Sequence, residues 1–91
     1  MYTPEQKAVQ TLLAELRKER GLRQIDLAER LQRSQQFVSR YEEGQKVLDL
    51  PELRQVCNAL GIRLAEFVQL YEERLTNSGL EENLWSKPES D

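Results

Sequence analysis

The stretch from Ser34 to Gly44 constrains the fold most, because it combines a helix start, a helix stop and one apolar side within a few residues. Ser34 is a favoured N-cap residue, since its hydroxyl can accept from a free backbone N–H in the first turn. Gly44 stands where a left-handed residue closes a helix. Phe37, Val38 and Tyr41 gather on one side at helical spacing. The stretch therefore predicts one short helix that buries this side.

The opposite side of this helix is polar and carries Gln35, Gln36, Ser39 and Arg40. Gln and Arg are the side chains that form bidentate hydrogen bonds with adenine and guanine edges in the major groove of DNA. A helix with two Gln in its first turn and a buried rear side meets the requirements of a base-reading helix. The same residue types are also common on solvated helix surfaces, so the pattern alone leaves both interpretations open.

Two helices are predicted before this stretch. The first spans about residues 4 to 20 and begins with a Thr3-x-x-Gln6 capping box. The second spans residues 24 to 31, and its cap position holds Arg23. Arg is not a capping side chain and its charge opposes the helix dipole, so we expect the first turn of this helix to fray. Only residues 32 to 34 separate it from the next helix, and a connection this short makes the two helices cross steeply, as in a helix-turn-helix.

Two helices are predicted after the stretch. Asp49 and Glu52 form a capping pattern at the start of a helix that Gly61 ends. Residues 64 to 75 form another helix with a broad apolar side, which either closes the core or pairs with a second copy. No segment alternates as a strand does, so the sequence predicts an all-α fold of five helices.

The composition argues against catalysis and metal binding. The chain of 91 residues has no His, which removes the commonest metal ligand and general base. Its one cysteine, Cys57, can form neither an intramolecular disulfide nor a zinc ligand set, and we expect it in the core. We therefore expect no enzyme activity, no metal and no cofactor.

The location of the protein is also predicted from absences in the sequence. No apolar run approaches the 18 residues of a membrane span, and no signal peptide is visible at the N-terminus. A lone cysteine is typical of a reducing compartment. We therefore expect a cytoplasmic protein that does not enter a membrane.

Charge is distributed unevenly along the chain. The net charge is −3, but residues 17 to 46 hold 8 basic and 5 acidic residues, while the remainder carries a net charge of −6. Non-specific attraction to DNA is mostly electrostatic, so the acidic flank lowers it and favours selective binding. An acidic protein with ordinary charge scatter would show the same totals, and this interpretation stays open.

Residues 16 to 67 resemble the Cro/C1-type (Xre) helix-turn-helix domain of phage and bacterial repressors. The resemblance is carried by Leu16-Arg17-Lys18-Glu19-Arg20-Gly21-Leu22, Gln24, Leu27-Ala28-Glu29-Arg30-Leu31, the stretch from Ser34 to Gly44, Lys46-Val47-Leu48-Asp49, Leu53, Val56, Ala59-Leu60-Gly61-Ile62 and Phe67. It implies a five-helix, lambda-repressor-like DNA-binding domain over residues 1–76, with the helix-turn-helix at about 24–43 and a C-terminal tail at 77–91. It also implies a transcriptional repressor that binds an inverted repeat in double-stranded DNA as a homodimer.

The resemblance assigns roles to individual residues. Base readers fall on Gln35, Gln36 and Arg40. An ion pair between helices falls on Arg17 and Glu42. Contacts with DNA phosphates are expected from residues around the base readers: Gln24, Arg23, Ser34, Ser39 and Lys46.

Two positions depart from the family pattern. Gln32 stands where the family usually has Gly in the turn, so we expect its backbone to be strained or to avoid the left-handed conformation. Arg23 stands where Ser or Thr usually caps the second helix. Both departures concern the geometry of the turn rather than the fold.

A second function, from a different class, is a protein-interaction module such as an antitoxin-like partner. It would use the apolar side of residues 64–75 and the acidic tail, in which Trp85 either packs on its own domain or dimer mate or contacts a partner. The last residues of the tail are expected to be disordered.

Overall fold

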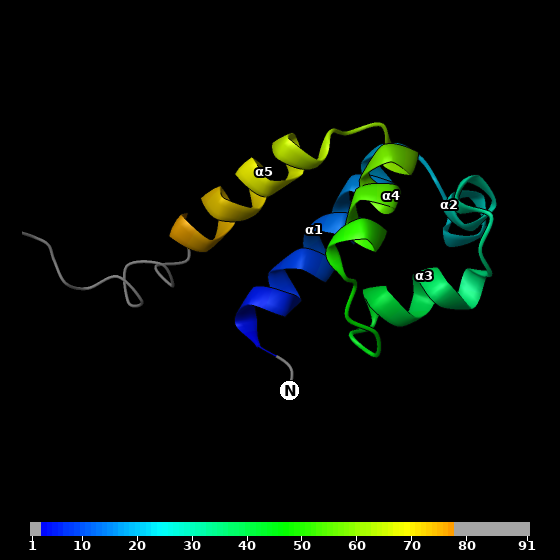
Figure 1. Cartoon of the computed structure of the whole chain (residues 1–91), viewed down its shortest axis with the longest axis horizontal. Coiled ribbons are helices and arrows are strands. Elements are labelled where there is room, and N and C mark those ends of the chain that lie inside the picture. The colour runs from blue at the N-terminus through cyan, green and yellow to red at the C-terminus, as the bar shows by residue number, and fades with distance from the viewer. Residues whose placement is uncertain (1–2, 78–91) are drawn as a thin grey trace, which may run out of the picture.

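The protein consists of five helices in a computed structural model that describes residues 3–77. The helices are α1 (Pro4–Glu19), α2 (Gln24–Leu31), α3 (Gln35–Glu42), α4 (Leu50–Leu60) and α5 (Leu64–Asn77) (Figure 1). Turns and loops account for every other described residue, so the predicted all-α fold is confirmed. Within the described range, no helix is long and apolar enough to cross a membrane.

Helices α1 and α4 each pack against three other helices. Helix α1 contacts α3, α4 and α5, and α4 contacts α1, α2 and α5, while α2 also packs against α3. Figure 1 shows α5 on one side of α1 and the α2–α3 pair on the other. The side chains between them form one core: Leu12, Leu13, Leu16, Leu27, Ala28, Phe37, Val38, Tyr41, Val56, Cys57, Leu60, Ile62 and Phe67.

Capping explains where most helices begin and end. The Thr3 hydroxyl accepts from the Gln6 backbone N–H, and the Gln6 side chain accepts from the Thr3 backbone N–H in return. Asp49 and Glu52 form the same reciprocal box at the start of α4. Helix α4 ends at Gly61, which adopts the left-handed conformation with φ of 79°. These predicted boundaries are confirmed.

The start of α2 differs from the prediction. The Asp26 carboxylate accepts a hydrogen bond of 2.8 Å from the Arg23 backbone N–H, and the Leu27 N–H donates to the Arg23 carbonyl at 3.1 Å. The Asp26 carboxylate therefore satisfies a free N–H at the start of α2, which the Arg23 side chain cannot do. The expectation that this turn frays was wrong.

The turn between α2 and α3 keeps a left-handed residue although no glycine is present. Gln32 has φ of 55° and ψ of 41°, and it is the one non-glycine residue of the described range with positive φ. The sequence left two alternatives, a strained backbone or one outside the left-handed region, and these angles exclude the second, because the short connection between the two helices requires a left-handed residue. An L-residue is strained in this region of backbone space.

Two helix ends also differ from the prediction. Helix α1 ends at Glu19, one residue earlier than predicted, and α5 continues to Asn77, which the sequence placed in the tail. The remainder of the predicted tail, including Trp85, lies outside the described residues.

Cys57 is a core residue, as predicted. Its side chain is completely buried on α4, and this burial raises the pKa of the thiol to about 11. A thiol that stays protonated at neutral pH is a poor nucleophile, which agrees with a packing role.

Replacement of Gln32 by glycine tests the strain in the turn. Glycine adopts positive φ without a steric cost, so Gln32→Gly should stabilise the fold by about 0.5–1 kcal/mol after the larger chain entropy of glycine is subtracted. Urea denaturation followed by circular dichroism measures this free energy of unfolding. Gln32→Ala keeps the Cβ atom and should bring no such gain. Equal effects of the two substitutions would show that the backbone at Gln32 is not strained.

Candidate nucleic-acid interface

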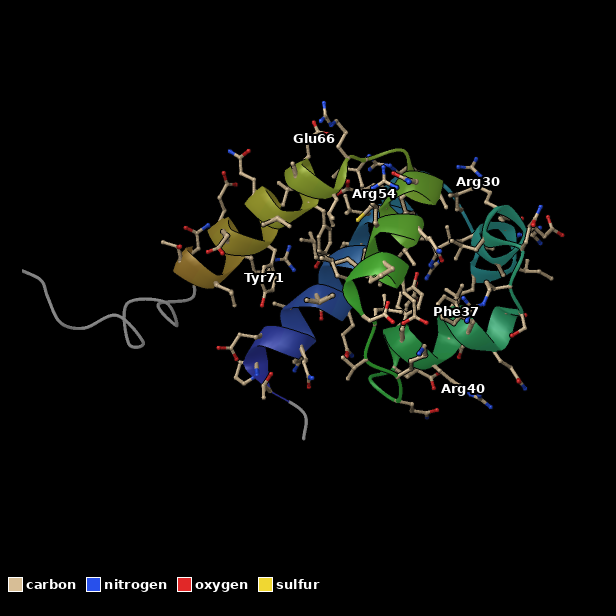
Figure 2. The ribbon with its side chains drawn as sticks, viewed as in Figure 1. Arg30, Phe37, Arg40, Arg54, Glu66 and Tyr71 are labelled. Carbon is tan, nitrogen blue, oxygen red and sulfur yellow. The ribbon has the colours of Figure 1, made fainter. Side chains whose placement is uncertain are left out.

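Helix α3 separates its residues into a buried and an exposed side. Val38 and Tyr41 are almost completely buried. Gln35, Gln36 and Arg40 are exposed, and Figure 2 shows Arg40 on the outer side of α3. The structure therefore brings the three predicted base readers together on one open surface.

Ser34 and Ser39 frame this open surface. The Ser34 hydroxyl accepts from the Phe37 backbone N–H at 3.3 Å, which places Ser34 at the N-cap of α3. The half-buried Ser39 donates its hydroxyl to the exposed Glu43 carboxylate one turn later, at 3.1 Å. Both hydroxyls thus make contacts within the helix. The Ser39 hydroxyl has one proton, so a phosphate that accepts it must replace the Glu43 carboxylate.

A buried ion pair fixes α3 to α1. Arg17 Nε donates to Glu42 Oε2 at 2.7 Å, and Arg17 Nη2 donates to Glu42 Oε1 at 3.0 Å. The third guanidinium nitrogen of Arg17 donates to the Leu22 carbonyl at 2.7 Å. The exposed fractions of the two side chains are 10% and 7%, and the hydrogen bonds to Glu42 raise the pKa of Arg17 further. This fork geometry fixes the angle between the two helices.

Gln24 connects this ion pair to the open surface. Its Nε2 donates to Glu42 Oε1 at 2.9 Å, and its Oε1 accepts from Gln35 Nε2 at 3.5 Å. The bond to Glu42 holds the Gln24 side chain, whereas the longer contact with the exposed Gln35 is weak. The sequence predicted a phosphate contact for Gln24 but gave no sign of these two contacts, because 18 residues separate Gln24 from Glu42.

The two predicted phosphate-binding cations form ion pairs. Arg23 Nε and Nη2 donate to the Asp26 carboxylate at 2.9 and 2.8 Å, and these bonds hold the pKa of Asp26 at about 2. Lys46 Nζ lies 3.3 Å from Glu52 Oε2. Arg40, by contrast, forms no ion pair with any residue between 3 and 77.

Arg33 is a cation that the sequence analysis missed. Its guanidinium carbon lies 3.9 Å from the centre of the Phe37 ring, and Lys46 Nζ lies 5.9 Å from the same ring. Stacking on an aromatic ring holds a guanidinium in place at little entropic cost. The spacing of four residues between Arg33 and Phe37, across the start of a helix, is the one signal that indicated this contact.

Comparison with known proteins gives the class. A family model described as helix-turn-helix matches residues 13–67, which is more than half of the chain, and the chain belongs to this family. The resemblance to the Xre/Cro type is confirmed. The protein is a DNA-binding transcription regulator, and the family and fold are those of regulators that are generally not enzymes.

Two solved structures share the fold. The clp gene regulator ClgR from Corynebacterium glutamicum has 26% sequence identity and a TM-score of 0.74, with 96% of this chain and 98% of that chain covered. A wild-type restriction-modification controller protein has 19% identity and a TM-score of 0.77, with 82% of this chain and 99% of that chain covered. A search of curated proteins found no significant match.

Removal of one member of the buried ion pair should be costly. Glu42→Gln leaves the Arg17 guanidinium buried without a counter-charge, so the free energy of unfolding should fall by about 3 kcal/mol. Arg17→Met should cost a similar amount, because it strands the carboxylate. Chemical denaturation of both variants and of the double variant measures the coupling. The double variant should lose clearly less than the sum, whereas strict additivity would mean that the two side chains do not interact.

Proposed function

We propose that the protein is a sequence-specific repressor that inserts α3 into the major groove and binds an inverted repeat as a homodimer. The observation that carries this proposal is the arrangement of α3, whose inner side is buried while Gln35, Gln36 and Arg40 face outward. The structural relatives are named as a gene regulator and a controller protein, which supports a regulatory role for this chain.

The outward residues suit base recognition in different ways. Gln35 is exposed, and its Nε2 has a long contact of 3.5 Å with Gln24 Oε1, so it loses no strong hydrogen bond when it turns to a base. Gln amides pair with adenine, and a guanidinium pairs with guanine. Arg40 lies one helical turn after Gln36 on α3, so it would reach a neighbouring base pair. Arg40 has no ion pair within residues 3–77, so it need not break one to reach a base.

Helix α5 supports the homodimer. Phe67 is its one fully buried residue, while Val68 and Leu70 are 40% and 38% exposed. Residues two apart point to different sides of a helix, so a second copy would cover one of these two side chains. The homodimer proposed here covers Val68. Two copies joined in this way would present two α3 helices about 34 Å apart, one turn of the duplex.

Replacement of Gln36 tests base reading. Binding sites are first selected from a pool of random duplexes, which should yield an inverted repeat. Gln36→Ala should then weaken binding to the selected site by about 5- to 150-fold, corresponding to 1–3 kcal/mol, and leave binding to random duplex almost unchanged. Fluorescence anisotropy measures both affinities. Gln55→Ala, at an exposed position on α4, is the control and should change neither. Equal losses on both DNAs would contradict a base-reading role for Gln36.

The second candidate function is a protein-interaction module that uses α5 and the tail. The exposure of Val68 and Leu70 favours it as much as it favours a homodimer. In this case the apolar side of α5 would contact another protein, and the isolated chain would remain a monomer.

A charge on α5 separates these two possibilities. Val68→Glu should convert a dimer into monomers and weaken binding to the inverted repeat, because a buried carboxylate in the interface is unfavourable. Analytical ultracentrifugation measures the mass. Gln55→Glu adds the same charge at an exposed position on α4 and should leave the dimer intact. A wild-type protein that is monomeric at high concentration would favour the interaction module.

A further inference from the structure

Two carboxylates hold the cations that are expected to meet DNA phosphates. We propose that Asp26 and Glu52 compete with DNA phosphates for Arg23 and Lys46, and thereby lower the affinity of the protein for non-specific DNA. The proposal rests on the proposed function, because it assumes that α3 faces DNA. It adds that two acidic residues set the selectivity of this surface without touching a base.

The first competitor is Asp26 on α2. Its carboxylate accepts two hydrogen bonds from the Arg23 guanidinium, at 2.9 and 2.8 Å. This is the bidentate geometry that the same guanidinium would offer to a phosphate. A phosphate and Asp26 therefore cannot both take the Nε–Nη2 edge of Arg23, and a phosphate that approaches Nη1 meets a cation whose charge Asp26 already offsets. The side chain of Arg23 is 78% exposed, so a phosphate can reach it.

The second competitor is Glu52 on α4. Lys46 Nζ lies 3.3 Å from Glu52 Oε2, and the Lys46 side chain is 35% exposed. The same ammonium group also lies above the Phe37 ring, 5.9 Å from the ring centre. Lys46 is thus held at the side of α3 by Glu52, and a phosphate must draw it away.

Helix capping does not account for these ion pairs. Asp26 and Glu52 are both the third residue of their helices and accept a backbone N–H at the helix start. Glu66 has this role in α5, where it accepts from the Arg63 backbone N–H at 3.2 Å. Yet Glu66 forms no ion pair within residues 3–77. A carboxylate can therefore cap a helix without an ion pair. The ion pairs of Asp26 and Glu52 at the starts of α2 and α4 are a feature separate from capping.

The competition acts more strongly on non-specific than on specific binding. Non-specific affinity comes almost entirely from cations that replace the counterions of DNA. A cation that already has a carboxylate partner contributes little to this attraction, whereas the base contacts of Gln36 and Arg40 do not depend on it. The exchange of a carboxylate for a phosphate also leaves an unpaired carboxylate, which takes up a cation from solution. The salt dependence of binding should therefore be weaker than the number of phosphate contacts implies.

The test uses Asp26→Asn and Glu52→Gln in the full chain. Each amide keeps an oxygen that can accept the capping N–H, but it removes the negative charge. Each variant should bind random-sequence duplex about twofold to fivefold tighter than the wild type does. The slope of log K against log salt concentration should become steeper by up to about 0.9 for each variant. The affinity for the selected site should rise by a smaller factor than the affinity for random duplex, and equal factors would contradict a role of the two carboxylates in selectivity.

Glu66→Gln is the matched control. It changes the net charge by the same amount at an equivalent capping position, and Figure 2 shows Glu66 on the opposite side of the molecule from Arg40. If both variants behave like Glu66→Gln while the wild type still binds a selected site, the proposed competition is wrong and the proposed function stands. If the wild type binds no duplex in a salt-dependent way, the proposed function itself is wrong. Thermal unfolding of each variant confirms that it is folded.

Discussion

The buried pair of Arg17 and Glu42 is the interaction on which the arrangement of the site depends. Arg17 is the one charged residue among the buried residues of the described range, and Glu42 is the last residue of α3. Through Leu22 and Gln24 the pair also reaches the α1–α2 connection and the start of α2. Buried ion pairs add little net stability compared with apolar packing, but the loss of one partner is costly. The pair therefore matters chiefly because it permits one orientation of α3.

The sequence predicts the helices well, because their limits depend on local chemistry. The Thr3 and Asp49 boxes and the left-handed Gly61 lie within a few residues of the groups that they satisfy. The two departures from the family pattern at the turn have a different origin. Asp26 supplies the cap that Arg23 does not, and the packing of α2 against α3 imposes a left-handed conformation on Gln32 despite its local preference.

The site could be predicted only in part. Helical spacing was enough to assign Gln36 and Arg40 to the open side of α3, because the buried side is marked by large apolar residues. The partner of each polar side chain was not predictable, since it depends on segments that meet only in the folded chain. Gln24 reaches Glu42 across 18 residues, and Lys46 reaches Glu52 across a loop.

In the proposed function, the base-reading side chains are open and the cations expected at DNA phosphates are restrained by carboxylates, which suits a protein of net charge −3. The central claim is that the Gln amides of α3 contact bases, and nuclear magnetic resonance of the Gln side-chain NH2 groups tests it most directly. On addition of a selected duplex, the signals of Gln35 and Gln36 should shift strongly, while those of Gln55 and Gln69, exposed on α4 and α5, stay in place. Unchanged Gln35 and Gln36 signals, with shifts confined to α5, would contradict the account.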